Sequence, residues 1–469
     1  NWPLARAVAQ YGQLGVVSGT ALDVIVARRL QDGDDGGHLR RALAHFPDPA
    51  MAQRVLDRYF QVAGRPALRA YKAKPMPTIQ QHRAPVELTL VANFAEVWLA
   101  KEGHSGLVGI NLLEKIQLPN LASLYGALLA GVDYVLMGAG IPTEIPGALD
   151  RLARHEPAAL RLHVAGAEPD DDYRVRFDPR RYFPDSGAAF KRPAFLAIVA
   201  SQVLAQALLK KATGRIDGFV VEGPTAGGHN APPRGHYPLN DRGEPIYGPK
   251  DAVDLAKIQA LGVPFWLAGS YGAPEQLRAA LAAGAAGVQV GTAFAFCVES
   301  GLSAAIKADV VARVRRGEAV TLTDPVASPT GFPFKVVQLP GTNADPALYA
   351  ARERRCDLGY LRHLYKRPDG TLDYRCPAEP VEDYVAKGGD RADTVGRKCL
   401  CNGLLANIGL PQWSHGELER PLVTAGDDLA AITRFLPPGA ETYTAADVLR
   451  GLLAPLAADA PGARMASPA

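Results

Sequence analysis

Cysteine is scarce in this sequence, with 5 Cys among 469 residues. So few cysteines in a long chain exclude a disulfide-rich secreted scaffold and favour reduced thiols, which are typical of a cytoplasmic protein. Long apolar runs are also absent, and no stretch reaches the roughly 20 residues that a transmembrane helix needs. We therefore expect a cytoplasmic protein with no membrane partner.

An excess of charge of one sign is missing as well. Lys and Arg number 51, Asp and Glu number 48, and the formal net charge is only +3. A balance this close to neutral excludes a strongly basic nucleic-acid-binding surface and favours small-molecule partners, with a homo-oligomer still open. Hydrophobic residues make up 48% of the chain, enough for one large domain with an appendage or for two domains.

Short apolar runs alternate with helical patterns along most of the chain. Seven such runs read as strands, near residues 14, 107, 132, 195, 219, 264 and 288. Strands separated by helical segments predict βαβ units and a parallel sheet. The fold class is therefore α/β, with a (β/α)8 TIM barrel as the expected architecture, although that barrel needs eight strands. We also expect a strand at residues 87–91 and a hairpin-like insertion within residues 160–185.

The most informative stretch runs from Gly218 to Gly235. A buried strand at residues 219–221 leads into Gly223, Gly227 and Gly228, and His229 follows directly. Glycine allows close backbone approach to a ligand and positive φ, where a Cβ would clash. A strand that ends in glycines and a titratable side chain is typical of an active site in a parallel α/β enzyme, although a plain tight turn gives the same local pattern.

Two later strands end in a glycine followed by a hydroxyl residue. These pairs are Gly269-Ser270 and Gly291-Thr292. In (β/α)8 enzymes, the loops after the last two strands commonly hold a phosphate through backbone N–H groups. The two pairs, one βα unit apart, predict a site for a phosphate-bearing cofactor.

These residues together resemble the FMN-dependent nitronate monooxygenases, also called 2-nitropropane dioxygenase-like proteins. The resemblance rests on the segments 222–229 (EGPTAGGH), 268–270 (AGS) and 290–294 (VGTAF), and extends more loosely over residues 1–335. The family pattern implies a further strand, ending in a Gly-Met-Gly type loop, before Asn1. That strand is expected to be missing from this chain, which accounts for the count of seven.

The resemblance implies a role for each matching residue. His229 is expected to be the active-site base, and FMN is the expected cofactor. The residues implied in holding FMN are Asn111, Ser201, Glu222, Ala226, Gly227, Gly228, Gly269, Ser270, Gly291 and Thr292. Among them, Gly269, Ser270, Gly291 and Thr292 are expected to bind the phosphate, with Gly-Ser standing where the family usually has Gly-Gly.

The activity implied by the resemblance is oxidative denitrification of an alkyl nitronate with O2, giving a carbonyl compound and nitrite. A nitronate or nitroalkane and O2 are then the expected partners. Two alternatives stay open: an FMN-dependent enoyl-thioester reductase using NAD(P)H, and a flavin-binding module without turnover. The sequence has no separate GxGxxG fingerprint, which disfavours a Rossmann domain for a dinucleotide.

Three regions follow from these patterns. Residues 1–320 are expected to form the barrel, 321–456 an extension packed on it, and 457–469 a disordered tail. Four of the five cysteines lie in the extension: Cys356, Cys376, Cys399 and Cys401. Their spacing lacks a CxxC pair, so reduced thiols are favoured over a structural zinc site and no metal is expected.

Overall fold

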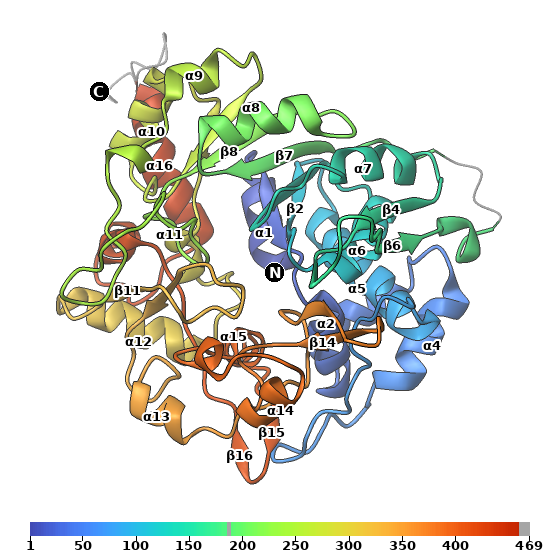
Figure 1. Cartoon of the computed structure of the whole chain (residues 1–469). Helices are drawn as coiled ribbons and strands as arrows, with labels where there is room; N and C mark the ends of the chain where they lie inside the picture. The colour runs from blue at the N-terminus through green and yellow to red at the C-terminus, as the bar shows by residue number, and fades with distance from the viewer. Residues whose placement is uncertain (185–188, 459–469) are drawn as a thin grey trace.

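The computed structural model describes residues 1–184 and 189–458. Its centre is an all-parallel sheet whose strands follow one another in chain order, β1-β2-β3-β7-β8-β9-β10, and curl around a common axis (Figure 1). The strands are β1 (Gly15–Ser18), β2 (Val108–Leu113), β3 (Tyr134–Gly138), β7 (Ala194–Val199), β8 (Gly218–Glu222), β9 (Phe265–Ala268) and β10 (Gly287–Gln289). All seven predicted strands and the (β/α)8 architecture are confirmed. Within the described ranges, no strand joins β10 to β1.

Helices cover the outer face of this sheet. Those of the barrel half are α1 (Trp2–Gln10), α2 (Leu22–Gln31), α3 (His38–Leu43), α4 (Pro49–Tyr59), α5 (Arg83–Lys101), α6 (Gln117–Leu129), α7 (Ile145–Ala153), α8 (Gln202–Lys211), α9 (Leu255–Gln259), α10 (Pro274–Ala282), α11 (Thr292–Ala295) and α12 (Ala304–Arg315). No helix in the described part of the chain is both long and apolar enough to cross a bilayer.

The strand predicted at residues 87–91 is wrong, because these residues lie inside the helix α5. Nearly the whole helix is buried, since α1, α2, α3, α4 and α6 surround it. Because this helix buries polar as well as apolar side chains, its sequence lacks the usual 3.6-residue pattern. Residues 87–90 alternate polar and apolar side chains, so this short part reads like a strand.

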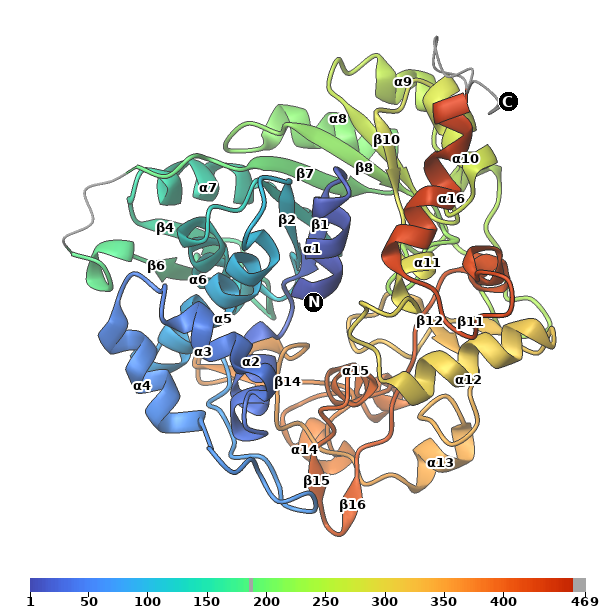
Figure 2. The same cartoon turned by 180° about the vertical axis from the view of Figure 1, so that it is seen from behind.

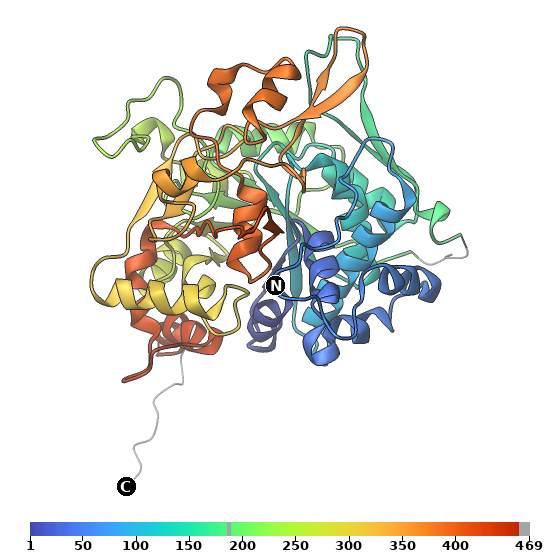
Figure 3. The same ribbon diagram turned by 90° about the horizontal axis from the view of Figure 1, so that it is seen from below.

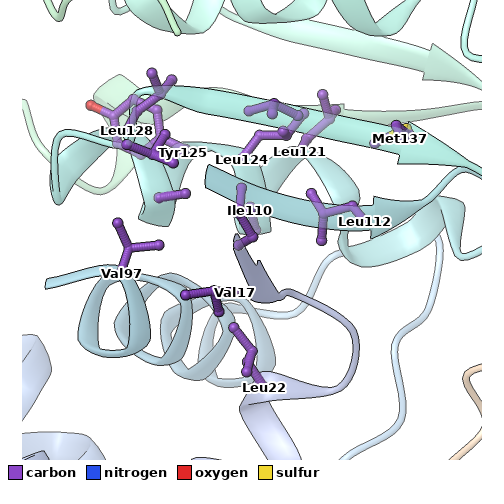
Figure 4. Packing of buried hydrophobic residues seen from close by; sticks show 14 of the residues in the cluster. Val17, Leu22, Val97, Ile110, Leu112, Leu121, Leu124, Tyr125, Leu128 and Met137 are labelled. Carbon is purple, nitrogen blue, oxygen red and sulfur yellow. The ribbon is translucent and has the colours of Figure 1, made fainter. Parts of the chain in front are cut away.

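Two apolar layers fill the two faces of the sheet. Figure 4 shows the outer layer, where Ile110 and Met137 from the strands pack near Leu121 and Leu124 of α6. The inner layer is smaller and consists of Leu136, Leu196, Val220 and Ala268, packed against partly buried neighbours. Side chains that lie in register with the inner layer and on the same face therefore point toward the barrel axis.

The predicted hairpin-like insertion is confirmed by antiparallel pairing of β4 (Ala158–Arg161) with β6 (Arg174–Phe177). Between them, β5 (Val164–Ala165) pairs in parallel with β13 (His363–Lys366) of the C-terminal region. Figure 3 shows the orange hairpin that contains β13 rising beside this teal part of the chain. The insertion thus joins the barrel half to residues far along the sequence.

The C-terminal region combines short strands and helices. They are β11 (Thr321–Asp324), β12 (Phe334–Val337), α13 (Pro346–Ala351), β14 (Leu372–Arg375), α14 (Val381–Ala386), α15 (Leu400–Asn407), β15 (Trp413–Ser414), β16 (Glu417–Leu418) and α16 (Ala445–Ala458), with a 3-10 helix at Asp427–Phe435. In Figure 2, α16 lies between α1 and α10, and it contacts both. The boundary at residue 320 stays a prediction. The predicted tail begins inside α16, and residues 459–469 lie outside the described ranges.

Candidate active site

Asn111 lies in the second half of β2, and Glu222 is the last residue of β8, which β3 and β7 separate from β2 in the sheet. Asn111 is in register with Leu136, and Glu222 with Ala268, both members of the inner apolar layer. Residues in register on parallel strands share a face, so both polar side chains face the barrel interior. The end of the barrel where parallel α/β enzymes build their sites therefore carries an amide and a carboxyl group.

Glu222 has no hydrogen-bond or ion-pair partner among the described residues. It is only partly accessible, and burial raises the pKa of its carboxyl group to about 7. The carboxyl group therefore keeps its proton to a much higher pH than a solvated glutamate does. A buried, unpaired, titrating group at a strand end is characteristic of a functional site rather than of a structural ion pair.

The loop that carries His229 is held by the C-terminal region. Gly228 has a φ of 79°, its N–H donates to Thr424 Oγ1 at 2.8 Å, and its carbonyl accepts from the Lys335 N–H at 2.9 Å. His229 forms an isolated antiparallel bridge with Phe334, whose ring lies edge-on to the imidazole at 4.9 Å between centroids. The position of the histidine thus depends on residues outside the barrel strands.

The two ring nitrogens of His229 have different surroundings. Nε2 lies 2.7 Å from the hydroxyl of Ser328, which is fully buried and also contacts Thr330 Oγ1 at 2.8 Å. Nδ1 has no partner in the described part of the chain. Burial, and then the charge of Lys115, lower the pKa of His229 to about 4. The imidazole is therefore neutral at physiological pH, with one nitrogen anchored and one available.

Three predicted cofactor residues have contacts within the protein itself. Gly227 is packed against the C-terminal region, since a Cβ there would lie 2.9 Å from both Ala425 C and Gly426 N. The carbonyl of Ala226 accepts from Asn230 Nδ2 at 2.9 Å. Ser201 is the N-cap of α8, where its Oγ accepts from the Leu204 N–H at 3.1 Å. Their predicted flavin contacts stay predictions.

The two predicted phosphate loops have features that fit an anion. Gly269 and Ser270 both have positive φ, 100° and 57°, and the Ser270 hydroxyl is buried with no hydrogen-bond partner. Within the described ranges, the backbone N–H groups of Ser270 and Gly272 donate to nothing. A Cβ built on Gly291 would meet no atom within 4 Å. Unused donors and open space suit the phosphate of FMN.

A segment of the C-terminal region lies over the same loops. The Gly426 N–H donates to Thr292 Oγ1 at 3.0 Å, and the Asp427 N–H donates to the Thr225 carbonyl at 3.0 Å. The Asp428 carboxyl group lies 3.0 Å from where a Cβ of Gly272 would be, and its Oδ1 is buried without a partner. An unpaired carboxylate opposes a phosphate. Asp428 therefore disfavours the binding of a phosphate at these loops.

His229 lines an inner chamber of about 350 Å³. Its walls combine barrel residues such as Ser18 and Ile116 with Tyr360, Leu361 and Leu404 of the C-terminal region. None of the four predicted phosphate-loop residues lines this chamber. The structure thus places His229 and the phosphate loops at the same end of the barrel without joining them in one cavity.

Sequence reasoning missed Lys115, Ser328 and Phe332, which together surround His229. Lys115 Nζ lies 4.0 Å from the centre of the Phe332 ring, and that ring lies 6.4 Å from the His229 ring. All three follow strand ends or lie in the turn-rich stretch at residues 323–334, where local patterns carry no positional information. The closely spaced aromatics of that stretch were the one available signal.

The four cysteines of the C-terminal region line a single space with room for about one water molecule. Cys356 and Cys376 share a hydrogen bond that lowers the pKa of the Cys356 thiol and raises that of Cys376. All five cysteines are free. Within the described ranges, no group of three or more His, Cys, Asp or Glu side chains has an arrangement that could hold a metal ion.

Comparison with known proteins places these residues in a family context. Residues 188–327 match the family model described as nitronate monooxygenase. A nitronate monooxygenase of Pseudomonas aeruginosa is 31% identical over 193 residues, which cover 41% of this chain and 49% of that protein. The chain thus matches about half the length of this curated relative.

Two solved structures align over most of the chain at low identity. FabK from Thermotoga maritima is 16% identical, with a TM-score of 0.45, covering 96% of this chain and 88% of that one. A nitroalkane oxidase from Streptomyces ansochromogenes is 14% identical, with a TM-score of 0.43, covering 97% and 92%. The segment that includes Glu222, His229 and both phosphate loops is the one that the family model matches. The similarity to the nitronate monooxygenase family that the sequence predicts is therefore confirmed for residues 188–327.

Proposed function

We propose that this protein is an FMN-dependent nitronate monooxygenase that converts alkyl nitronates to carbonyl compounds and nitrite with O2. The observation that carries the proposal is the placement of an unpaired Glu222 carboxyl group at the end of β8 and of His229, held through Nε2 by Ser328, on the loop that follows it. Both lie in the segment that matches the family model. Perturbed titratable groups at the carboxyl end of a parallel barrel support an enzyme rather than a binding module.

FMN would be held at the phosphate loops by the hydroxyl of Ser270 and the backbone N–H groups of Ser270, Gly272 and Thr292. The open space beside Gly291 would leave room for the phosphate. Bound FMN would supply the electron transfer between substrate and O2, which no side chain of this chain can perform. The Asp428 carboxyl group, which lies beside Gly272, would weaken this arrangement.

His229 suits an anionic substrate better than a neutral one. A base with a pKa of about 4 is a poor acceptor for a proton on carbon at neutral pH. A nitronate has already lost that proton, and a neutral imidazole anchored through Nε2 can hydrogen-bond to its oxygen through Nδ1. We therefore assign His229 to binding and orienting the nitronate, with Ser328 fixing the orientation of the ring.

Glu222 is the better candidate for moving a proton. Its pKa of about 7 lets it hold or release a proton at working pH without a large free-energy difference. Its place on the inner face of β8 puts this carboxyl group at the same end of the barrel as His229. We assign it to proton transfer during turnover.

The test is the visible spectrum of the protein as purified and after addition of FMN, followed by anaerobic reduction. We expect the spectrum of a bound flavin, and bleaching by ethylnitronate but not by NADPH. Bleaching by NADPH alone would replace the proposal with the enoyl-thioester reductase. A bound flavin that neither compound reduces would indicate a module without turnover, and absence of flavin binding would overturn the assignment of FMN.

A further inference from the structure

A second, larger cavity lies on the outer side of the residues that enclose His229. This outer cleft has a volume of about 700 Å³. It shares the wall residues Ile116, Tyr360 and Leu361 with the inner chamber, and Phe332 and Lys115 also line it. We propose that the outer cleft binds an amphipathic anion, meaning an extended apolar chain that ends in a phosphate or carboxylate group.

The charges of the cleft support the anionic end. Lys115, Arg362 and Arg397 all line it. In the described part of the chain none of them forms a hydrogen bond or ion pair with a carboxylate, and Lys115 feels only the nearby charge of Glu114. Lys115 Nζ donates to the Thr330 carbonyl at 3.0 Å, and Arg397 Nη1 donates to the Ser328 carbonyl at 2.6 Å. Cations that face a cavity and are satisfied only by carbonyl oxygens keep most of their attraction for an anion.

Arg362 is held in the same manner. Its Nη2 donates to the Pro77 carbonyl at 3.1 Å, and its guanidinium group lies 4.6 Å from the centre of the Tyr374 ring. These contacts fix the planar group in place without neutralising it. A fixed guanidinium group that still has unused N–H donors is suited to bidentate recognition of phosphate or carboxylate.

The carboxylates of the cleft do not cancel these cations. Glu114 accepts from Gln117 Nε2 at 3.2 Å and lies 3.5 Å from His163 Nε2, and this contact raises the pKa of His163. Asp393 accepts from the hydroxyl of Tyr384 at 3.2 Å. Two partly compensated carboxylates therefore face two arginines and Lys115, whose pKa is lowered by burial, and the balance of charge in the cleft favours an anion.

The rest of the cleft is suited to an apolar body. Side chains without charge that line it are Leu118, Pro119, Ile141, Leu162, Phe332 and Leu364. Ile141 leaves 56% of its surface exposed and lines the cleft, so its side chain is available to contact an apolar ligand. A nitronate of a few carbon atoms would leave most of this volume empty, since cavities of this size enclose drug-sized ligands.

The wall shared with the inner chamber gives the cleft a place in the reaction. A chain bound in the cleft with its far end against Ile116 and Tyr360 would lie on the other side of this wall from the chamber that His229 lines. This last step rests on the proposed function and names its substrate class as long-chain nitronates with an anionic group at the other end. Binding in the cleft itself does not depend on turnover.

Isothermal titration of the full chain with a set of octyl compounds tests the binding. We expect octyl phosphate to bind at least about tenfold more tightly than either octanol or inorganic phosphate, since a charge-assisted hydrogen bond contributes ~1.5 kcal/mol or more. Octyltrimethylammonium should bind weakest. If octanoate binds as tightly as octyl phosphate, the site recognises negative charge alone. If octanoate binds more weakly, the site is specific for phosphate. Equal affinity of the alcohol and the phosphate would overturn the proposal.

Two arginine variants test the location. Arg362→Gln and Arg397→Gln should each lower the affinity for octyl phosphate about tenfold and change the affinity for octanol by less than about twofold. The control is Arg316→Gln, which removes an arginine outside the cleft that pairs with Glu318. Unchanged affinity in both cleft variants would place the anion elsewhere, and the wild-type series remains decisive if a variant does not fold.

The apolar end has its own test. Ile141→Trp fills part of the cleft from an exposed position, so the fold should tolerate it. We expect this variant to lower the affinity for octyl phosphate more than the affinity for butyl phosphate. An equal effect on both would contradict the placement of the ligand's alkyl chain beside Ile141. Tight octyl phosphate binding without nitronate oxidation would refute the proposed function alone, and nitronate oxidation without selective octyl phosphate binding would refute this inference alone.

Discussion

At the scale of single residues, burial shifts the pKa values of Glu222 and His229 in opposite directions, and both shifts favour the neutral form. Burial disfavours the charged form of each, so it raises the pKa of the acid and lowers the pKa of the base. The position of His229 was predicted from its place after a strand and two glycines, and that of Glu222 from the resemblance to the nitronate monooxygenase family. The sequence could not predict the pKa shifts, because these depend on how deeply the folded protein buries both groups and, for His229, on the nearby charge of Lys115.

Replacing Glu222 with Gln should stabilise the protein at alkaline pH. The unfolded chain loses the Glu222 proton near pH 4.5, whereas the folded chain keeps it to about pH 7, so the wild type loses stability across this window as pH rises. Gln cannot ionise, so the variant should gain up to about 3 kcal/mol at pH 8 relative to wild type. Urea denaturation at pH 4.5 and pH 8 measures the difference.

Glu441→Gln is the matched control, because Glu441 is exposed. It should show no such pH dependence. A Glu222→Gln variant whose stability relative to wild type is the same at both pH values would mean that the carboxyl group is solvated in the folded protein.

His229→Asn should raise KM for ethylnitronate about tenfold with a smaller change in kcat. The reason is the loss of one hydrogen bond to a charged ligand, which contributes ~1.5 kcal/mol. Because the pKa of His229 is about 4, its protonation should not shape the activity profile between pH 6 and 8, where Glu222 titrates. Steady-state kinetics with ethylnitronate and with nitroethane measure these effects. A much larger loss on nitroethane would return His229 to the role of general base.

At the scale of elements, strands were predictable and one helix was not. Each strand of the sheet is a short apolar run bounded by glycine or polar residues, so its position follows from local sequence. Helix α5 was partly misread because its neighbours bury it on nearly all sides. The glycines after the strands likewise could be located but not interpreted from local sequence. Gly227 belongs to the predicted motif, yet it packs against residues 425–426, which local sequence could not indicate.

Gly227→Ala and Gly291→Ala form a matched pair that separates structure from cofactor binding. An alanine at residue 227 would place a Cβ 2.9 Å from backbone atoms of Ala425 and Gly426, so the segment must move, at a cost of about 1–3 kcal/mol. An alanine at residue 291 meets open space and should leave the melting temperature unchanged. Its Cβ would instead occupy room for the phosphate and lower FMN affinity.

Melting temperature and FMN titration of both variants provide the readouts. If Gly291→Ala binds FMN as tightly as wild type, the phosphate does not lie against this glycine. If Gly227→Ala melts as wild type does, the segment at residues 425–426 is not held against this loop in solution.

At the scale of the whole molecule, the barrel half and the C-terminal region share their apolar cores. One cluster combines Val8 of α1, Phe294 of α11 and Val311 of α12 with Val337 and Leu449 of the C-terminal region. Lys74, Asp23 and Tyr360 form a buried polar contact between the same two parts, with Lys74 Nζ 2.8 Å from the Asp23 carboxylate. Such long-range contacts leave no trace in local sequence patterns, which is why the division near residue 320 could be predicted only from composition.

Because these cores are shared, we expect one cooperative unfolding transition for the full chain. Separating the two parts would expose the apolar faces of α11 and α12 and remove Tyr360 from the buried contact that it makes with Asp23 and Lys74. A chain cut at residue 320 should therefore aggregate or unfold rather than yield a folded barrel. Scanning calorimetry of the full chain and limited trypsin digestion measure this. Two separate transitions, or release of a stable fragment that begins near residue 320, would show that the C-terminal region folds as a module of its own. In that case, the residues it places around His229, Ser328 and Phe334 among them, would be recruited by docking rather than by a common core.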